Sequence, residues 1–177
     1  MKIIKNILVL LCLCVILTGC PFSSPYTLDD SPSINVEDEL LGNWATFVKR
    51  PNSSKAEPVK LILTKKNETE YNIAFIGFLK ELRNYRKEKS DSITGTAFMS
   101  TVGVKQFFNI SIKSQNYIAE LRLKDDKLSL LPLVEHFTAK MIRNNLALRK
   151  SVEFHYKTRV HPMLDDDFCL KDMIRVN

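Results

Sequence analysis

The sequence lacks the short motifs that identify most catalytic and cofactor sites. It has no nucleophile elbow, no phosphate-binding loop, no paired cysteines at metal-ligand spacing and no cluster of its three histidines. We therefore expect no catalytic residue, no metal ligand and no cofactor, and we do not expect an enzyme.

The remaining titratable pairs offer little chemistry. Neighbouring residues of a helix face apart, so Glu135 and His136 would not form a pair. Glu153 and His155 would share the polar face of a strand, which favours a surface contact over an acid–base couple. His161 precedes residues 165–167, three aspartates without the spacing of a calcium loop, and this pattern is typical of a solvated turn.

A strong excess of one charge is also missing. The formal charge of +6 falls to +4 (6 − 2) if Lys2 and Lys5 are removed with a leader segment. A mildly basic chain without a dense basic stripe does not favour nucleic-acid binding and is compatible with an anionic envelope surface.

No apolar run is long enough to cross a bilayer as a helix. The run from Ile7 to Leu17 is about half of the roughly 20 residues required, and no basic flank follows it. Lys2 and Lys5 precede it, which is the pattern of a secretory signal peptide over residues 1–19.

The end of this segment, Leu17-Thr18-Gly19-Cys20, resembles the lipobox of bacterial lipoproteins. The resemblance implies that the Cys20 thiol carries diacylglycerol, that the chain is cut before Cys20, and that lipid holds the protein at a membrane of the cell envelope. Pro21 stands where an Asp often retains lipoproteins at the inner membrane, which favours the outer membrane.

Cysteine is too scarce for a disulfide in the mature chain. Of the four cysteines, Cys12 and Cys14 leave with the signal and Cys20 carries lipid. Only Cys169 remains, in an apolar context that predicts a buried, inert thiol. The fold must therefore depend on its apolar core.

Residues 20–37 lack apolar periodicity and are rich in proline and serine, so we predict a lipidated cysteine followed by a flexible tether. Residues 38–177 are expected to form a single β-rich domain, because most of this region alternates apolar and polar residues with period two. The predicted inward positions are Val59, Leu61, Leu63, Tyr71, Ile73, Phe75, Ile93, Ala97, Met99, Phe108, Ile110, Ile112, Tyr117, Ala119, Leu121, Leu123, Leu128 and Leu130.

Turns and a helix punctuate these strands. Asn67-Glu68-Thr69 and Asp125-Asp126 predict turns, since Asn and Asp bond their own backbone and tolerate left-handed angles. Apolar spacing from Val134 to Leu146 predicts a helix that begins after Pro132 and stops at Asn144-Asn145. Residues 152–157 and 169–176 are predicted as strands. The resulting fold class is mainly β, an antiparallel barrel or sandwich of about eight strands with one packed helix.

The domain opens with Leu40-Leu41-Gly42-Asn43-Trp44, which resembles the opening of lipocalin-like barrels, where the tryptophan closes the barrel floor. Over roughly residues 38–150 the chain is similar to a group of uncharacterised small bacterial lipoproteins. That resemblance implies an antiparallel β fold and brings no catalytic residues. The chain departs from the pattern at residues 78–89 and after Leu148.

The departure at 78–89 is a basic insert. We identify Lys80, Arg83, Arg86 and Lys87 as candidates for binding a membrane surface or a partner, against the alternative of a solvated hairpin tip or short helix.

The aromatic residues of the strands leave one structural question open. Trp44, Phe75 and Phe108 are candidates either for the lining of an apolar cavity or for a filled core, and their size favours a core.

The sequence predicts an envelope lipoprotein whose β domain is a non-catalytic binding or structural module. Its expected partners are the membrane, through covalent lipid, and an envelope protein, peptidoglycan or lipid surface. The alternatives are a lipocalin-like carrier of a small apolar ligand and a periplasmic inhibitor or immunity lipoprotein.

Overall fold

The structure is a computed structural model of the chain, and it describes residues 23–49, 55–77, 92–133, 142–158 and 169–176. Cys20 and the signal segment, the basic insert with Lys80, Arg83, Arg86 and Lys87, and His161 with its aspartates lie outside these ranges.

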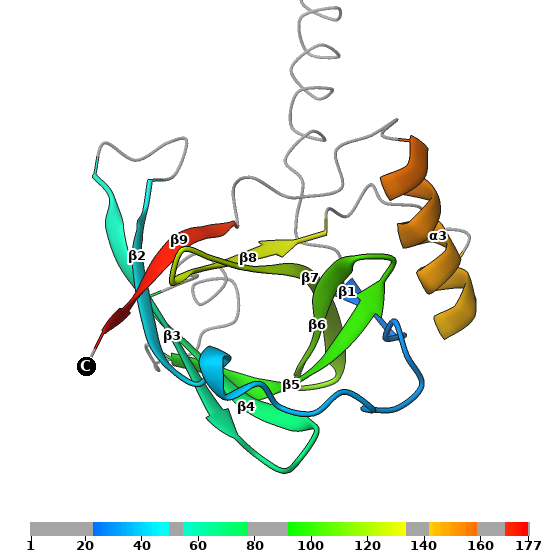
Figure 1. Cartoon of the computed structure of the whole chain (residues 1–177), viewed down its shortest axis with the longest axis horizontal. Coiled ribbons are helices and arrows are strands. Elements are labelled where there is room, and N and C mark those ends of the chain that lie inside the picture. The colour runs from blue at the N-terminus through cyan, green and yellow to red at the C-terminus, as the bar shows by residue number, and fades with distance from the viewer. Residues whose placement is uncertain (1–22, 50–54, 78–91, 134–141, 159–168, 177) are drawn as a thin grey trace, which may run out of the picture.

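Eight antiparallel strands close into a barrel, which confirms the predicted mainly β class (Figure 1). Each strand pairs with the next along the chain, and the last pairs back with the first. In chain order they are β2 (Gly42–Val48), β3 (Glu57–Lys65), β4 (Glu70–Ile76), β5 (Ser92–Val102), β6 (Lys105–Ile112), β7 (Gln115–Lys124), β8 (Lys127–Pro132) and β9 (Leu170–Val176).

Three further elements accompany the barrel. A short strand, β1 (Ser23–Ser24), adds to the edge of β7, and a 3-10 turn, η1 (Asp38–Leu40), precedes β2. Within the described residues the α-helix is α3 (Asn145–Thr158), which lies on the side of the barrel opposite β2, β3 and β9 (Figure 1).

The period-two alternation determines what fills the barrel. On β3, for example, Leu61 faces inward between Trp44 of β2 and Phe75 of β4, its partners in the register. Alternate side chains of a strand point to opposite faces, so the outward positions, such as Lys60, leave the interior apolar. The inward residues form one continuous core of aromatic and aliphatic side chains.

Both predicted tight turns are present. Asp125 and Asp126 have φ angles of 51° and 56°, the left-handed pair that a two-residue hairpin between β7 and β8 requires. Between β3 and β4, the Asn67 side chain accepts hydrogen bonds from the backbone N–H groups of Thr69 and Glu70, at 2.9 and 2.8 Å.

The prediction for residues 142–157 is wrong. Residues 142–144 are not helical, and the predicted strand at 152–157 lies within α3. Asn144 starts this helix instead of stopping one, because its Oδ1 accepts the N–H of Ala147 at 2.8 Å. Leu148, Val152 and His155 are the buried residues of α3, and their spacing is helical. The apolar–polar alternation of residues 152–157 hides this spacing in the sequence. Residues 134–141 of the predicted helix lie outside the described ranges.

The prediction of a flexible tether is wrong from residue 23 onward. Ser23 and Ser24 pair with Tyr117 and Asn116 of β7, and Leu28 is only 1% exposed. This segment is bound to the barrel through one apolar side chain and several backbone groups. Such contacts leave no apolar periodicity in the sequence, so an amphipathic pattern does not reveal them.

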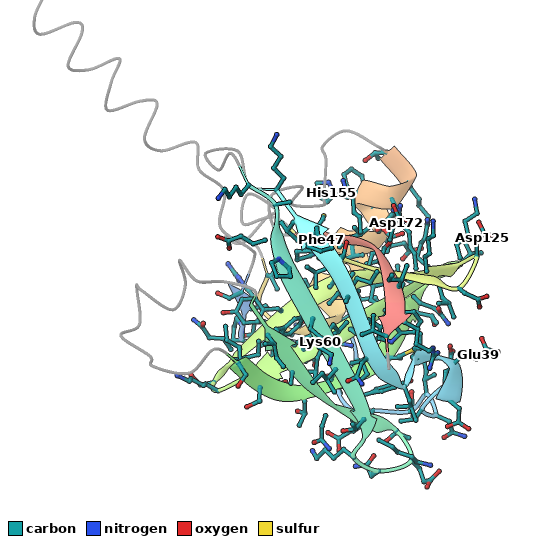
Figure 2. All side chains as sticks on the ribbon, turned by 90° about the vertical axis from the view of Figure 1, so that its left-hand side faces the viewer. Glu39, Phe47, Lys60, Asp125, His155 and Asp172 are labelled. Carbon is teal, nitrogen blue, oxygen red and sulfur yellow. The ribbon has the colours of Figure 1, made fainter. Side chains whose placement is uncertain are left out.

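The strand directions define two ends of the barrel. At the Phe47 end, β2, β4, β6 and β8 finish and β3, β5, β7 and β9 begin. The Asp125 end is the opposite one and carries the turns that join β3 to β4, β5 to β6 and β7 to β8. Figure 2 labels Phe47 on β2 and Asp125 at the tip of the β7–β8 hairpin.

In the described part of the chain, no helix is both long enough and apolar enough to span a membrane.

We predict that Phe108→Ala lowers the free energy of unfolding by about 3–5 kcal/mol, because it empties a fully buried ring site in the core. Urea denaturation measures the change. Phe47→Ala is the matched control, since that side chain is 73% exposed, and its effect should stay within about 0.5 kcal/mol. Equal effects of the two substitutions would contradict the assignment of inward and outward faces.

Candidate functional site

The barrel interior is occupied by its own side chains. Trp44, Phe75 and Phe108, which the sequence left between core and cavity, all lie in the core and are at most 5% exposed. The Phe108 ring packs against Tyr71 with 5.1 Å between centroids. Side chains this inaccessible contact one another, so these residues act as packing and not as the wall of a solvent-sized space.

One end of the core is covered by a cation. The guanidinium of Arg175 lies 4.6 Å from the centre of the Trp44 ring and donates hydrogen bonds to the carbonyls of Leu41 and Glu39, both at 2.6 Å. The indole N–H of Trp44 donates to the carbonyl of Leu40 at 2.9 Å. These bonds satisfy the polar atoms at this end of the interior and fix the turn η1 over it.

A second apolar cluster lies outside the barrel, under α3. Phe107 and Ile118 point outward from β6 and β7, and they are buried by Leu148 and Val152 of the helix and by Leu28 of the N-terminal segment. Burial of an outward strand face requires a covering element. The outer flank of β5, β6 and β7 is therefore a buried interface within the chain.

The N-terminal segment is fixed to this flank by polar bonds. The buried Asn109 side chain accepts the N–H of Leu28 at 2.7 Å and donates to the Ser100 hydroxyl at 2.7 Å. Arg149 of α3 forms an ion pair with Asp29 at 2.5 Å. It also donates to the carbonyl of Thr101 on β5 at 2.7 Å. One arginine thus joins the segment, the helix and the barrel.

The most strongly polar group of the flank is a buried carboxylate. Glu120 of β7 is fully buried, yet three donors surround it. Its Oε1 accepts from Arg122 Nε at 2.6 Å and from Lys105 Nζ at 3.1 Å. Its Oε2 accepts the hydroxyl of Tyr156, which reaches it from α3.

These contacts determine the protonation states. Burial alone would raise the pKa of the Glu120 carboxyl, but the hydrogen bonds from Arg122, Tyr156 and Lys105 outweigh it and leave that pKa below its ordinary value of 4.5. Burial and the Glu120 carboxylate raise the pKa of Tyr156, so its phenol stays protonated as a donor. The cluster is an ionised acceptor with both oxygens occupied, which suits holding α3 in place better than transferring protons.

The other candidate residues are not brought together. In the described ranges, Glu153 pairs with Lys157 on the exposed side of α3 at 2.7 Å, whereas His155 is buried, so the two do not share a face. Cys169 is buried, as predicted. Among the described histidines, cysteines and acids, no group of three could hold a metal ion.

The sequence does not single out Glu120, because it occupies an outward position of β7 where the period-two alternation already predicts a polar residue. A signal was present in the neighbouring positions. Phe107-Phe108 on β6 and Ile118-Ala119 on β7 are consecutive apolar residues, which indicates strands buried on both faces.

No family model, curated protein or solved structure matches this chain. Its function must therefore be inferred from its own residues and geometry.

We predict that Leu28→Ala lowers the free energy of unfolding by about 2–5 kcal/mol, because it opens a cavity between β6 and α3. Leu146→Ala, at a position 58% exposed on the same helix, is the matched control and should have an effect within about 0.5 kcal/mol. An unchanged free energy of unfolding for Leu28→Ala would contradict the docking of this segment and support a flexible tether.

We predict that Glu120→Gln lowers the free energy of unfolding by about 1–3 kcal/mol at neutral pH, because it removes the negative charge that accepts hydrogen bonds from three donors. A carboxyl with a lowered pKa stabilises the fold above its ordinary value of 4.5 and loses that stabilisation as pH falls through the lowered value. The difference in free energy of unfolding between the wild type and Glu120→Gln should therefore become smaller below that pH.

Urea denaturation over a pH series measures both effects. Glu68→Gln is the control, since its ion pair with Lys65 is exposed and should contribute less than about 0.5 kcal/mol. A gap that widens on acidification would contradict an ionised Glu120.

Proposed function

We propose that this protein is a lipid-anchored envelope lipoprotein whose β-barrel is a non-catalytic binding or structural module. The observation that carries the proposal is the sequence Leu17-Thr18-Gly19-Cys20 after a basic start and a short apolar run. Cys20 is the lipidated residue, and Pro21 after it favours the outer membrane over the inner.

Two features of the barrel support a module without chemistry. The interior side chains are packed against one another, and the carboxylate of Glu120 is ionised with both oxygens occupied. A general base needs an oxygen that faces the substrate and a pKa near the working pH. The proposed partners therefore meet the outer surface of the barrel.

The carrier alternative is less well supported. A carrier of an apolar ligand needs a lined cavity of several hundred cubic ångströms. Trp44, Phe75 and Phe108 are the large side chains that would have to line it, and they pack in the core instead. The other alternative is a periplasmic inhibitor or immunity lipoprotein, whose partner is an envelope enzyme.

The basic insert keeps its proposed role. Lys80, Arg83, Arg86 and Lys87 follow β4 and precede β5, so the segment that carries them leaves and rejoins the barrel at the Phe47 end. Clustered cations in a lipid-anchored protein favour contact with anionic headgroups.

We predict that Cys20→Ser moves the protein from the membrane fraction to the soluble fraction, because the serine hydroxyl does not accept the diacylglycerol that a cysteine thiol does. Fractionation of cells by ultracentrifugation, with mass spectrometry of the N-terminal peptide, measures this. Cys169→Ser changes the other thiol of the mature chain and should leave membrane retention unaltered. Full retention of Cys20→Ser would refute the anchor.

A further inference from the structure

We propose that the outward face of β2, β3, β4 and β9 binds a second copy of this chain about a twofold axis. In this dimer, Lys60 of each copy faces Asp172 of the other, and the Phe47 side chains pack between the two charged pairs. The inference goes beyond the proposed module, because it names a partner for the outer surface, and it does not depend on the anchor at Cys20.

The outward positions of these four strands are rich in apolar residues. They include Ala45 and Phe47 on β2, Ile62 on β3, Ala74 and Ile76 on β4, and Ile174 on β9, and none of these described residues belongs to the inner core. Phe47 is 73% exposed and Ile174 is 54% exposed. An antiparallel sheet that faces water usually presents polar side chains to it, so an apolar outward face indicates a contact surface.

Another outward face of the same barrel shows how such residues are covered. On β6 and β7, the outward Phe107 and Ile118 are buried by α3 and by Leu28 of the N-terminal segment. On the side of β2, β3 and β9, no helix of the described chain lies over the sheet (Figure 1). The exposed Phe47 and Ile174 are therefore available to another molecule.

Two opposite charges indicate what that molecule is. Lys60 points outward from β3, and Asp172 is exposed at a bulge of β9, on the other side of β2 (Figure 2). Among the described residues neither side chain has an ion-pair partner, whereas Lys171, next to Asp172, is already engaged in a contact of its own. Burial of an unpaired charge is costly, so the covering surface must present an anion to Lys60 and a cation to Asp172.

A second copy related by a twofold axis meets both requirements. Such an axis makes an interface in which one residue contacts a second and the second contacts the first. An axis midway between Lys60 and Asp172 crosses the face at β2. Ala45 is in register with Lys60 on one side and with Ile174 on the other, so Ala45 and Phe47 lie beside this axis. A surface of anionic headgroups would attract Lys60 but repel Asp172.

The dimensions of the face predict the strength of the dimer. The seven residues of β2 extend about 23 Å, and four strands about 4.8 Å apart span roughly 19 Å. The outer surface of a barrel is convex, so two copies meet mainly along β2 and not across this whole area. The interface is at the small end of specific interfaces, and we expect a dimer that exchanges with the monomer.

The test cross-links the full chain in the cells that produce it. In a Cys169→Ala background, Ala45→Cys places a thiol beside the axis and keeps the Phe47 ring. We expect a short bismaleimide to give severalfold more covalent dimer than with Val104→Cys, the control at a position 97% exposed in the β5–β6 turn. Denaturing gels and mass spectrometry of the product measure this. Equal yields at the two positions, or a product that contains a different protein, would overturn the dimer.

The apolar contact is tested in the same Ala45→Cys chain. Phe47→Ala should lower the yield of covalent dimer severalfold, because it removes the largest exposed side chain beside the axis. Leu146→Ala, at a position 58% exposed on α3, is the control and should leave the yield unaltered. A yield that does not respond to Phe47→Ala would exclude this face as the interface. Membrane fractionation of the same cells reports on the anchor separately.

The charged pairs are tested by exchange. Lys60→Glu should lower the yield severalfold, since two carboxylates then face each other, whereas Lys124→Glu on the β7–β8 hairpin should not. Adding Asp172→Lys to Lys60→Glu should restore the yield, because the pairs return with their signs reversed. Asp172 has a φ of 50°, which Asn also tolerates, so Asp172→Asn is a second rescue and should restore the yield in part. A loss that neither substitution relieves would assign the face to a different acidic partner and overturn self-association.

Discussion

The pairing of β9 with both β2 and β8 is the constraint on which the rest of the structure depends. Without it, seven strands would form an open sheet with two unpaired edges and an interior exposed along one side. With it, the backbone groups of β2 and β8 find partners and the inward side chains enclose one another. Closure also places Arg175 over Trp44, so the last strand of the barrel covers the core at its first strand. The long connection from β8 to β9 passes through α3, which is why the helix can pack on the outside without interrupting the sheet.

Closure leaves the outer surface of the barrel as the surface that a partner can contact. Because the interior is filled, the outward faces of the strands determine how the barrel binds another molecule. The flank of β5, β6 and β7 is already covered by α3 and by the N-terminal segment, joined through Asn109, Arg149 and Glu120. The face of β2, β3 and β9 carries no helix in the described structure (Figure 1). Docking of the segment from Ser23 to Asp29 on the covered flank fixes the place at which the N-terminal part of the chain meets the barrel.

Part of this fold was predictable from local pattern. The strand faces of Leu61, Phe75 and Phe108 follow from period-two alternation, and the turn at Asp125 follows from the backbone that Asp tolerates. Residues 152–157 were misread because five or six residues of alternation can also be the exposed and buried sides of a helix. Asn144 was misread because the same side chain can end one helix or begin another, and only the position of its hydrogen-bond donor distinguishes the two.

The sequence by itself determined the class of fold and the apolar core, and it predicts a lipid anchor and a mature chain without a disulfide. These depend on residue type and on neighbours within a few positions. Tertiary structure alone decided that the barrel is closed and filled, that Glu120 is buried, and that residues 23–29 are docked. The physical reason is that each depends on contacts between distant segments, such as Leu28 with Asn109 and Glu120 with Tyr156, whose partners no local period encodes.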